Sequence, residues 1–391
     1  MRKLERKIDS YIFIPCTLEN LNKVSNIENE RQELFIEKLT HTSEYELNPK
    51  AHLGLSRVLL EENDVSYYLI QEKRKKITEK CKIFFTYQPT TKLGVVIICI
   101  PNFQKELTVF YDNMTKGKLY INGMEIKLYL SEKYGIRQSG SAHSLTFTNK
   151  EFSPDYMCSL LSNEAYMHSV NSKIIDKDLK YAATNNLEVF EFKNLYAFAT
   201  SIVCVLKNYY NSFEERIFDE VQTVFIVEII MLQDASLIRV NDEITDQIEN
   251  TTSLSLKKIE EINFQFAKTI KLWDFNLYIY PLTRKQADII YKAFNIDKVY
   301  GVFLKNKSLL EHIINTHNSI INEKEARILN IVLVVLATTQ AAPIVISAYR
   351  SLRLDTFELN NYILAITIPF ITLVIILLLI NRLSNKRRGK K

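Results

Sequence analysis

Four carboxylates stand at helical spacing near the middle of the chain. They are Asp242, Glu243, Asp246 and Glu249. Residues three and four positions apart share a face of an α-helix, and carboxylate oxygens are the ligands that hard divalent cations take in proteins. The spacing makes these residues a candidate metal site. The competing interpretation is a solvated helix face.

A second polar set lies inside an apolar run that carries no charge, residues 328–349. At 100° per residue, Asn330, Gln340 and Ser347 share an arc of about 100° with Ala337 between them. Polar side chains in lipid must face protein or water. These four residues are candidate pore-lining positions, and the alternative is hydrogen bonding between packed helices.

Other chemical motifs are few. The segment "RQSGSAHS", residues 137–144, has backbone amides around Gly140 that suit an anion, but the interpretation we favour is an exposed loop. The sequence contains no Walker loop, no G-x-G-x-x-G, no H-E-x-x-H and no nucleophile elbow. We therefore predict that the protein is not an enzyme.

The uncharged run between Arg327 and Arg350 is 22 residues long. As a helix it measures about 33 Å, enough to cross a hydrocarbon core of about 30 Å. A second apolar run covers residues 362–380. We predict transmembrane helices at 328–349 and 362–380, joined by a short outer loop at 350–361.

Two other apolar stretches, residues 195–206 and 224–232, are too short to span a bilayer, and Glu228 interrupts the second. Both are expected to be buried helices of a soluble domain.

Charge fixes the expected orientation. The net charge is +5, but the last ten residues alone carry +6, which leaves −1 for the rest of the chain. Positive segments stay on the cytoplasmic side, so the basic tail at 381–391 is expected inside. Two spans then place both termini in the cytoplasm, in a multi-pass protein of the plasma (inner) membrane. A nucleic-acid partner is not indicated.

The part before the membrane reads as an α+β cytoplasmic domain with an antiparallel sheet, residues 1–194. A polar, helical stretch is expected up to residue 80. Strands are expected at 82–88, 94–101, 107–111, 118–121 and 124–130, with a further strand at 187–192. Asn122-Gly123 is a strong signal for a hairpin turn.

A helical region and stalk are expected over residues 195–327. The period becomes helical, with a long segment at 213–249 and another from Thr283, a candidate N-cap, to Phe294. No proline occurs between 302 and 342, so one helix is expected to run from residue 302 to residue 349, into the first span.

This arrangement is similar to that of the CorA family of divalent-cation channels. The likeness is closest in "HNSIINEKEARILNIVLVVLATTQAAPIVIS", residues 317–347, which resembles the family's junction between stalk and first span. The resemblance implies a homo-oligomer of five subunits around a pore made by the first spans. It also implies Mg²⁺ or another divalent cation as substrate or regulator.

The Gly-Met-Asn signature that ends the first span in that family is absent. The chain has "SAYRSLRLD" instead, which places Arg350 and Arg353 at the outer mouth. Rings of arginine repel divalent cations.

Three functions therefore stay open. The first is a CorA-like ion channel or transporter gated by the cytoplasmic domain. The second is a defence-type membrane effector or sensor, in which a small ligand or a partner on that domain rearranges the membrane hairpin without selective metal transport. The third is a binding domain with a plain membrane anchor.

Overall fold

The computed structural model describes residues 8–20, 23–24, 54–69, 75–103, 105–164, 177–185, 193–207, 213–249, 256–273, 278 and 281–352. The chain divides into two compact units, Met1–Leu310 and Glu311–Lys391. The described residues combine a large sheet with helices, which confirms the predicted mixture of α and β structure.

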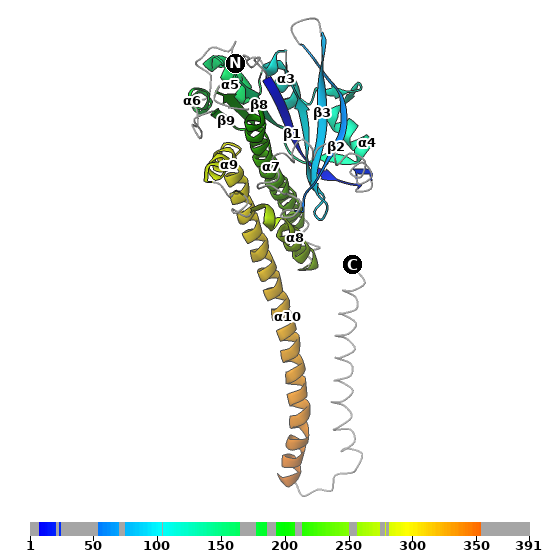
Figure 1. The fold of residues 1–391 in the computed structure, drawn as a ribbon. Helices are drawn as coiled ribbons and strands as arrows, with labels where there is room; N and C mark the ends of the chain where they lie inside the picture. The colour runs from blue at the N-terminus through cyan, green and yellow to red at the C-terminus, as the bar shows by residue number, and fades with distance from the viewer. Residues whose placement is uncertain are drawn as a thin grey trace. The chain divides into compact units, whose positions relative to one another are not determined.

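The first unit is built around a ten-stranded sheet in the order β6-β5-β2-β3-β4-β1-β8-β10-β9, with β7 also paired to β1 (Figure 1). Among the described strands only β8 and β10 pair in parallel, so the predicted antiparallel character holds for the other pairs. The strands are β1 (Ile8–Leu18), β2 (Ser56–Tyr68), β3 (Lys76–Gln88), β4 (Leu93–Ile100), β5 (Tyr120–Ile121), β6 (Met124–Glu125), β7 (Ile136–Gln138), β8 (His143–Thr148), β9 (Lys193–Phe198) and β10 (Ser201–Leu206).

Helices lie against both faces of this sheet. On one face α3 and α5 pack together and contact β2 and β10, and on the other α7 crosses β1 and β4. The helices are α3 (Leu107–Thr115), α4 (Ile126–Tyr134), α5 (Pro154–Ser162), α6 (Lys177–Thr184), α7 (Phe213–Glu249), α8 (Leu256–Thr269), the short 3-10 helix η3 (Ile270–Trp273), α9 (Pro281–Ala293) and α10 (Ile296–Leu352).

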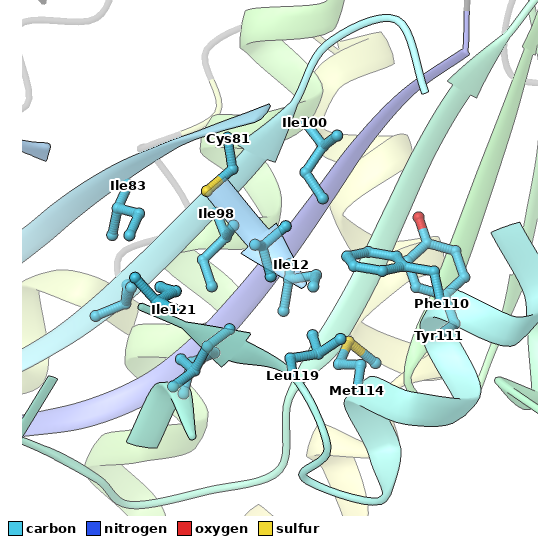
Figure 2. Close-up of a cluster of buried hydrophobic side chains, with 14 of the residues drawn as sticks. Ile12, Cys81, Ile83, Ile98, Ile100, Phe110, Tyr111, Met114, Leu119 and Ile121 are labelled. Carbon is cyan, nitrogen blue, oxygen red and sulfur yellow. The ribbon is translucent and has the colours of Figure 1, made fainter. Parts of the chain in front are cut away.

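The core on the α3 side is a cluster of strand and helix side chains. Figure 2 shows Ile12, Ile83 and Ile98 from three neighbouring strands in one buried cluster with Phe110 and Met114 of α3. Because helices also cover the other face, β4 is apolar at nearly every position rather than at alternate ones. That double coverage explains the continuous run "GVVIICI".

Several predicted elements are confirmed. The strands expected at 82–88 and 94–101 lie in β3 and β4, and the long helix at 213–249 is α7. Asn122 and Gly123 join β5 to β6 with φ angles of 51° and 82°, the left-handed values that such a turn requires. The single helix expected over 302–349 lies within α10. Helix α9 begins at Pro281 rather than at Thr283.

The polar helical stretch predicted up to residue 80 is wrong. Residues 8–18, 56–68 and 76–80 belong to strands β1, β2 and β3. Strand β1 lies between β4 and β8, with partners more than 70 residues away in the chain. Its extended form depends on those partners, which no local pattern reveals.

Two predicted strands are also wrong. Residues 107–111 begin helix α3, and residues 126–130 begin helix α4 after only two residues of strand. The buried positions of α3 include Leu107, Phe110, Tyr111 and Met114, which are spaced three and four apart. That helical spacing overrides the strand preference of the aromatic residues.

The helix predicted at 195–206 is a hairpin, β9 and β10, and both strands belong to the sheet. Its expected burial holds, since all six positions of β10 are buried. The sheet thus continues to residue 206, beyond the boundary predicted at 194. The strand predicted at 187–192 lies outside the described residues.

Within the described part of the chain, one helix is long and apolar enough to cross a membrane, the segment Asp219–Asp246 of α7. It is not one of the two C-terminal spans, and 78% of its most apolar window is buried inside the protein. Glu228, only 1% exposed, forms an ion pair there with Arg57 of β2. Residues 224–232 are therefore part of a core helix, as predicted. The second predicted span lies outside the described residues.

Candidate functional site: the long helix and the side chains at its base

Helix α10 is anchored in the first unit by a single buried stripe. Ile296, Phe303 and Leu310 recur every seven residues and are 1–2% exposed. Aromatic rings surround the stripe. The ring centroid of Phe266 of α8 lies 4.6 Å from that of Phe303, and the ring centroid of Trp273 of η3 lies 5.4 Å from that of Tyr300. The first turns of α10 are therefore fixed to the other helices of this unit.

A buried lysine lies next to these helices, where β9 meets α7 and α9. The Lys193 side chain is fully buried, and its ammonium donates to Asp219 Oδ1 at 2.6 Å. It lies 3.3 Å from both Thr223 Oγ1 and Gln286 Oε1. An ammonium has three donors, and here three oxygens accept from it.

The same network holds α9 to α7 directly. Gln286 Nε2 donates to Thr223 Oγ1 at 2.9 Å, and Gln222 Nε2 donates to Thr283 Oγ1 at 2.5 Å. Helix α9 leads into α10, so these polar contacts position the base of the long helix. Sequence reasoning missed Lys193 altogether, because a lysine that follows an alternating segment gives no signal of burial.

Further along α10, the side chains from residue 328 to residue 336 are apolar around the whole helix except at Asn330. The exposed large side chains there are Ile328, Leu329, Ile331, Leu333, Val334 and Leu336, with exposed fractions of 36% to 63%. A helix that is apolar on all sides is a buried core helix or a membrane span. Among the described residues, these apolar side chains form an exposed surface.

The predicted pore-lining residues belong to this same helix. Asn330 and Ala337 are exposed. Gln340, Ser347 and Arg350 are on the α10 backbone, but their side chains lie outside the described ones, as does the whole of Arg353. Because α10 is unbroken, the four positions keep the shared arc that the sequence predicted.

The structure does not gather the predicted acidic residues into a metal site. Among the described side chains no group of three or more His, Cys, Asp or Glu is placed to hold a metal ion. Glu243 instead accepts from Arg239 Nε at 3.1 Å, while Asp242 and Asp246 are exposed. The side chain of Glu249 is outside the described set.

The predicted anion loop is packed against the protein. A side chain added at Gly140 would come within 3.3 Å of both Ile238 of α7 and Pro15 of β1. The Gln138 side chain donates to the Gly140 carbonyl at 2.7 Å. The loop therefore fits between β1 and α7, which favours the structural interpretation over an anion cradle.

Asp234 in the buried part of α7 gives a prediction about pH. Burial raises the pKa of this carboxyl group to about 6, above its ordinary value of about 3.9. Its contribution to stability is full below about pH 4 and is lost as the pH rises through 6. Asp234→Asn should therefore raise the free energy of unfolding at pH 7.5 by roughly 2–3 kcal/mol and leave it unchanged at pH 4. Denaturant titrations at both pH values measure this, and equal effects at the two values would contradict it.

Comparison with known proteins adds no relative: no family model, no curated protein and no solved structure matches the chain.

Proposed function

We propose that the chain is an oligomeric membrane protein, CorA-like in its organisation, whose α/β unit gates an ion pathway formed by α10 helices from several copies. One observation carries the proposal. Helix α10 is anchored by buried residues at its start and continues without a break into a segment that is apolar on all sides and exposed. Lipid and other copies of the chain are the surfaces that would cover it.

The gating role follows from the same continuity. Packing of Ile296, Phe303 and Leu310 ties α10 to the first unit, so a ligand or partner that repacks this unit would move the helix. Two helices cannot enclose a pore, and the pathway therefore requires several copies around an axis. Five copies, and Mg²⁺ or another divalent cation as substrate or regulator, are what the resemblance to the CorA family suggests.

A second candidate is a membrane effector or sensor that perturbs the membrane without selective metal transport. The observation in its favour is Arg350 and Arg353, which stand where the Gly-Met-Asn filter would be. Positive rings at a pore mouth disfavour cations.

Reconstitution tests the proposal. The purified chain in liposomes should form oligomers and pass ions, measured as magnesium, cobalt and chloride flux beside a count of subunits. An oligomer that passes none of these ions would favour the membrane effector or sensor. A monomer that passes none of them would favour a binding domain with a plain membrane anchor.

Topology is tested separately by labelling in cells. The cysteine introduced by Asp355→Cys should react with an impermeant reagent added outside the cell. The cysteine introduced by Ser384→Cys should not react. The opposite pattern would contradict the predicted cytoplasmic termini and the gating by a cytoplasmic unit.

A further inference from the structure

A sharp elbow joins α9 to α10. Helix α9 ends at Ala293, and Asn295 adopts a left-handed conformation with φ of 55°. The amides of Lys298 and Val299 then donate to the Asn295 carbonyl at 3.0 and 3.3 Å, which starts α10. Any movement of this elbow moves the base of the long helix.

The elbow is held on the sheet by an aromatic contact. Phe294 lies between the two helices, and its ring centroid is 4.4 Å from that of His143, with the planes tilted by 56°. His143 is the first residue of β8 and pairs with Phe13 of β1. Both rings of the contact are buried, at 5% exposed for His143 and 7% for Phe294.

At neutral pH the buried His143 ring is uncharged. Its Nδ1 lies 3.0 Å from the Ser141 carbonyl, which accepts the single ring proton. Burial lowers the pKa of His143 to about 4, and the Ser141 carbonyl opposes that shift. No side-chain charge is among the causes of the shift, although the surrounding elements carry Arg137, Asp234, Lys292, Asp297 and Lys298. A second proton would therefore place an uncompensated charge between β8 and the elbow.

We propose that His143 and Phe294 form a proton-sensitive latch, which holds the α9–α10 elbow on the sheet and releases it when His143 is protonated. The latch is a structural switch in the first unit. Its role as a regulator of ion passage rests on the proposed function, since α10 would carry the released movement toward the membrane segment.

The size of the effect follows from linkage. The imidazole of a released elbow has an ordinary pKa near 6.5, against about 4 when the latch is closed. A lowered pKa gives stability that is present above the ordinary value and lost as the pH falls toward the lowered one. Between pH 7.5 and pH 5 the ratio of closed to open latch should fall about 30-fold.

The protein contains its own reporter for this movement. Trp273 is the only tryptophan of the chain, and its ring lies 6.4 Å from Tyr291 and 5.4 Å from Tyr300, one on each side of the elbow. Emission from Trp273, recorded for the full chain in detergent micelles, should show a transition between pH 6.5 and pH 4. His143→Gln and His143→Met cannot take the proton and should abolish it.

Matched variants separate this histidine from other groups. His312→Gln changes an exposed histidine on α10, and Asp234→Asn removes the buried carboxyl that titrates in the same range; both should keep the transition. The latch would be overturned if the fluorescence transition persisted in the two His143 variants, or if it were lost in Asp234→Asn alone.

Phe294→Leu tests the contact while keeping His143. This variant should move the midpoint of the fluorescence transition toward pH 6.5. An unchanged midpoint would also overturn the latch. Far-UV circular dichroism identifies variants that unfold. Because the fluorescence needs no passage of ions, a chain that conducts nothing can still show the latch, and a conducting chain can lack it.

Discussion

Lys193→Met should unfold the first unit more readily than any other single change considered for this chain. It removes the Lys193 ammonium from the Asp219 carboxylate, which is only 8% exposed, and it removes a donor from Thr223 and from Gln286. Breaking a buried ion pair by removing one partner costs about 3–5 kcal/mol. We expect a fall in the midpoint of thermal unfolding of about 10 °C.

The double variant Lys193→Met with Asp219→Leu is the matched control for charge. It removes both ions, so it should recover most of the lost stability, because two apolar side chains can replace a buried pair at little cost. Lys180→Met removes an exposed lysine and should change stability by at most about 0.5 kcal/mol. If Lys193→Met melts like the unaltered protein, the buried network does not stabilise the base of α10.

Reversing the charge of the predicted outer mouth should give the largest change in ion selectivity. Arg350→Glu together with Arg353→Glu replaces positive rings by negative ones in an assembled pore, and rings of carboxylates select cations. The ratio of cation to chloride flux in liposomes should rise on the order of tenfold. A ratio that stays constant would place these residues away from the ion path.

Gln340→Leu tests the polar arc of the same pathway. In an oligomer with α10 innermost, the change should dry the constriction and reduce flux. Thr339→Leu, which lies off the arc on the same helix turn, is the control and should leave flux nearly unchanged. If Gln340→Leu weakens subunit association while flux stays the same, the arc packs helices together and does not line a pathway.

Local sequence determined the long elements of this protein. Helices α7 and α10 follow from apolar residues at a sustained helical period and from the absence of proline over most of α10. The Asn122-Gly123 turn follows from residues that tolerate positive φ. The shared arc of Asn330, Gln340 and Ser347 follows from the same continuity, because an unbroken helix fixes the angle between any two of its positions.

Tertiary structure decided the elements whose conformation depends on residues far away in the chain. The sequence pattern did not place β1 between β4 and β8, and it assigned the β9–β10 hairpin to a helix. Strands β1 and β10 are buried at most of their positions, so their local pattern loses the alternation that marks a strand, whereas β9 keeps that alternation. The buried Lys193 and the contact of His143 with Phe294 were invisible for a related reason. Burial of a single polar side chain depends on which residues, here up to about 150 positions away in the chain, pack around it, and no periodicity records that.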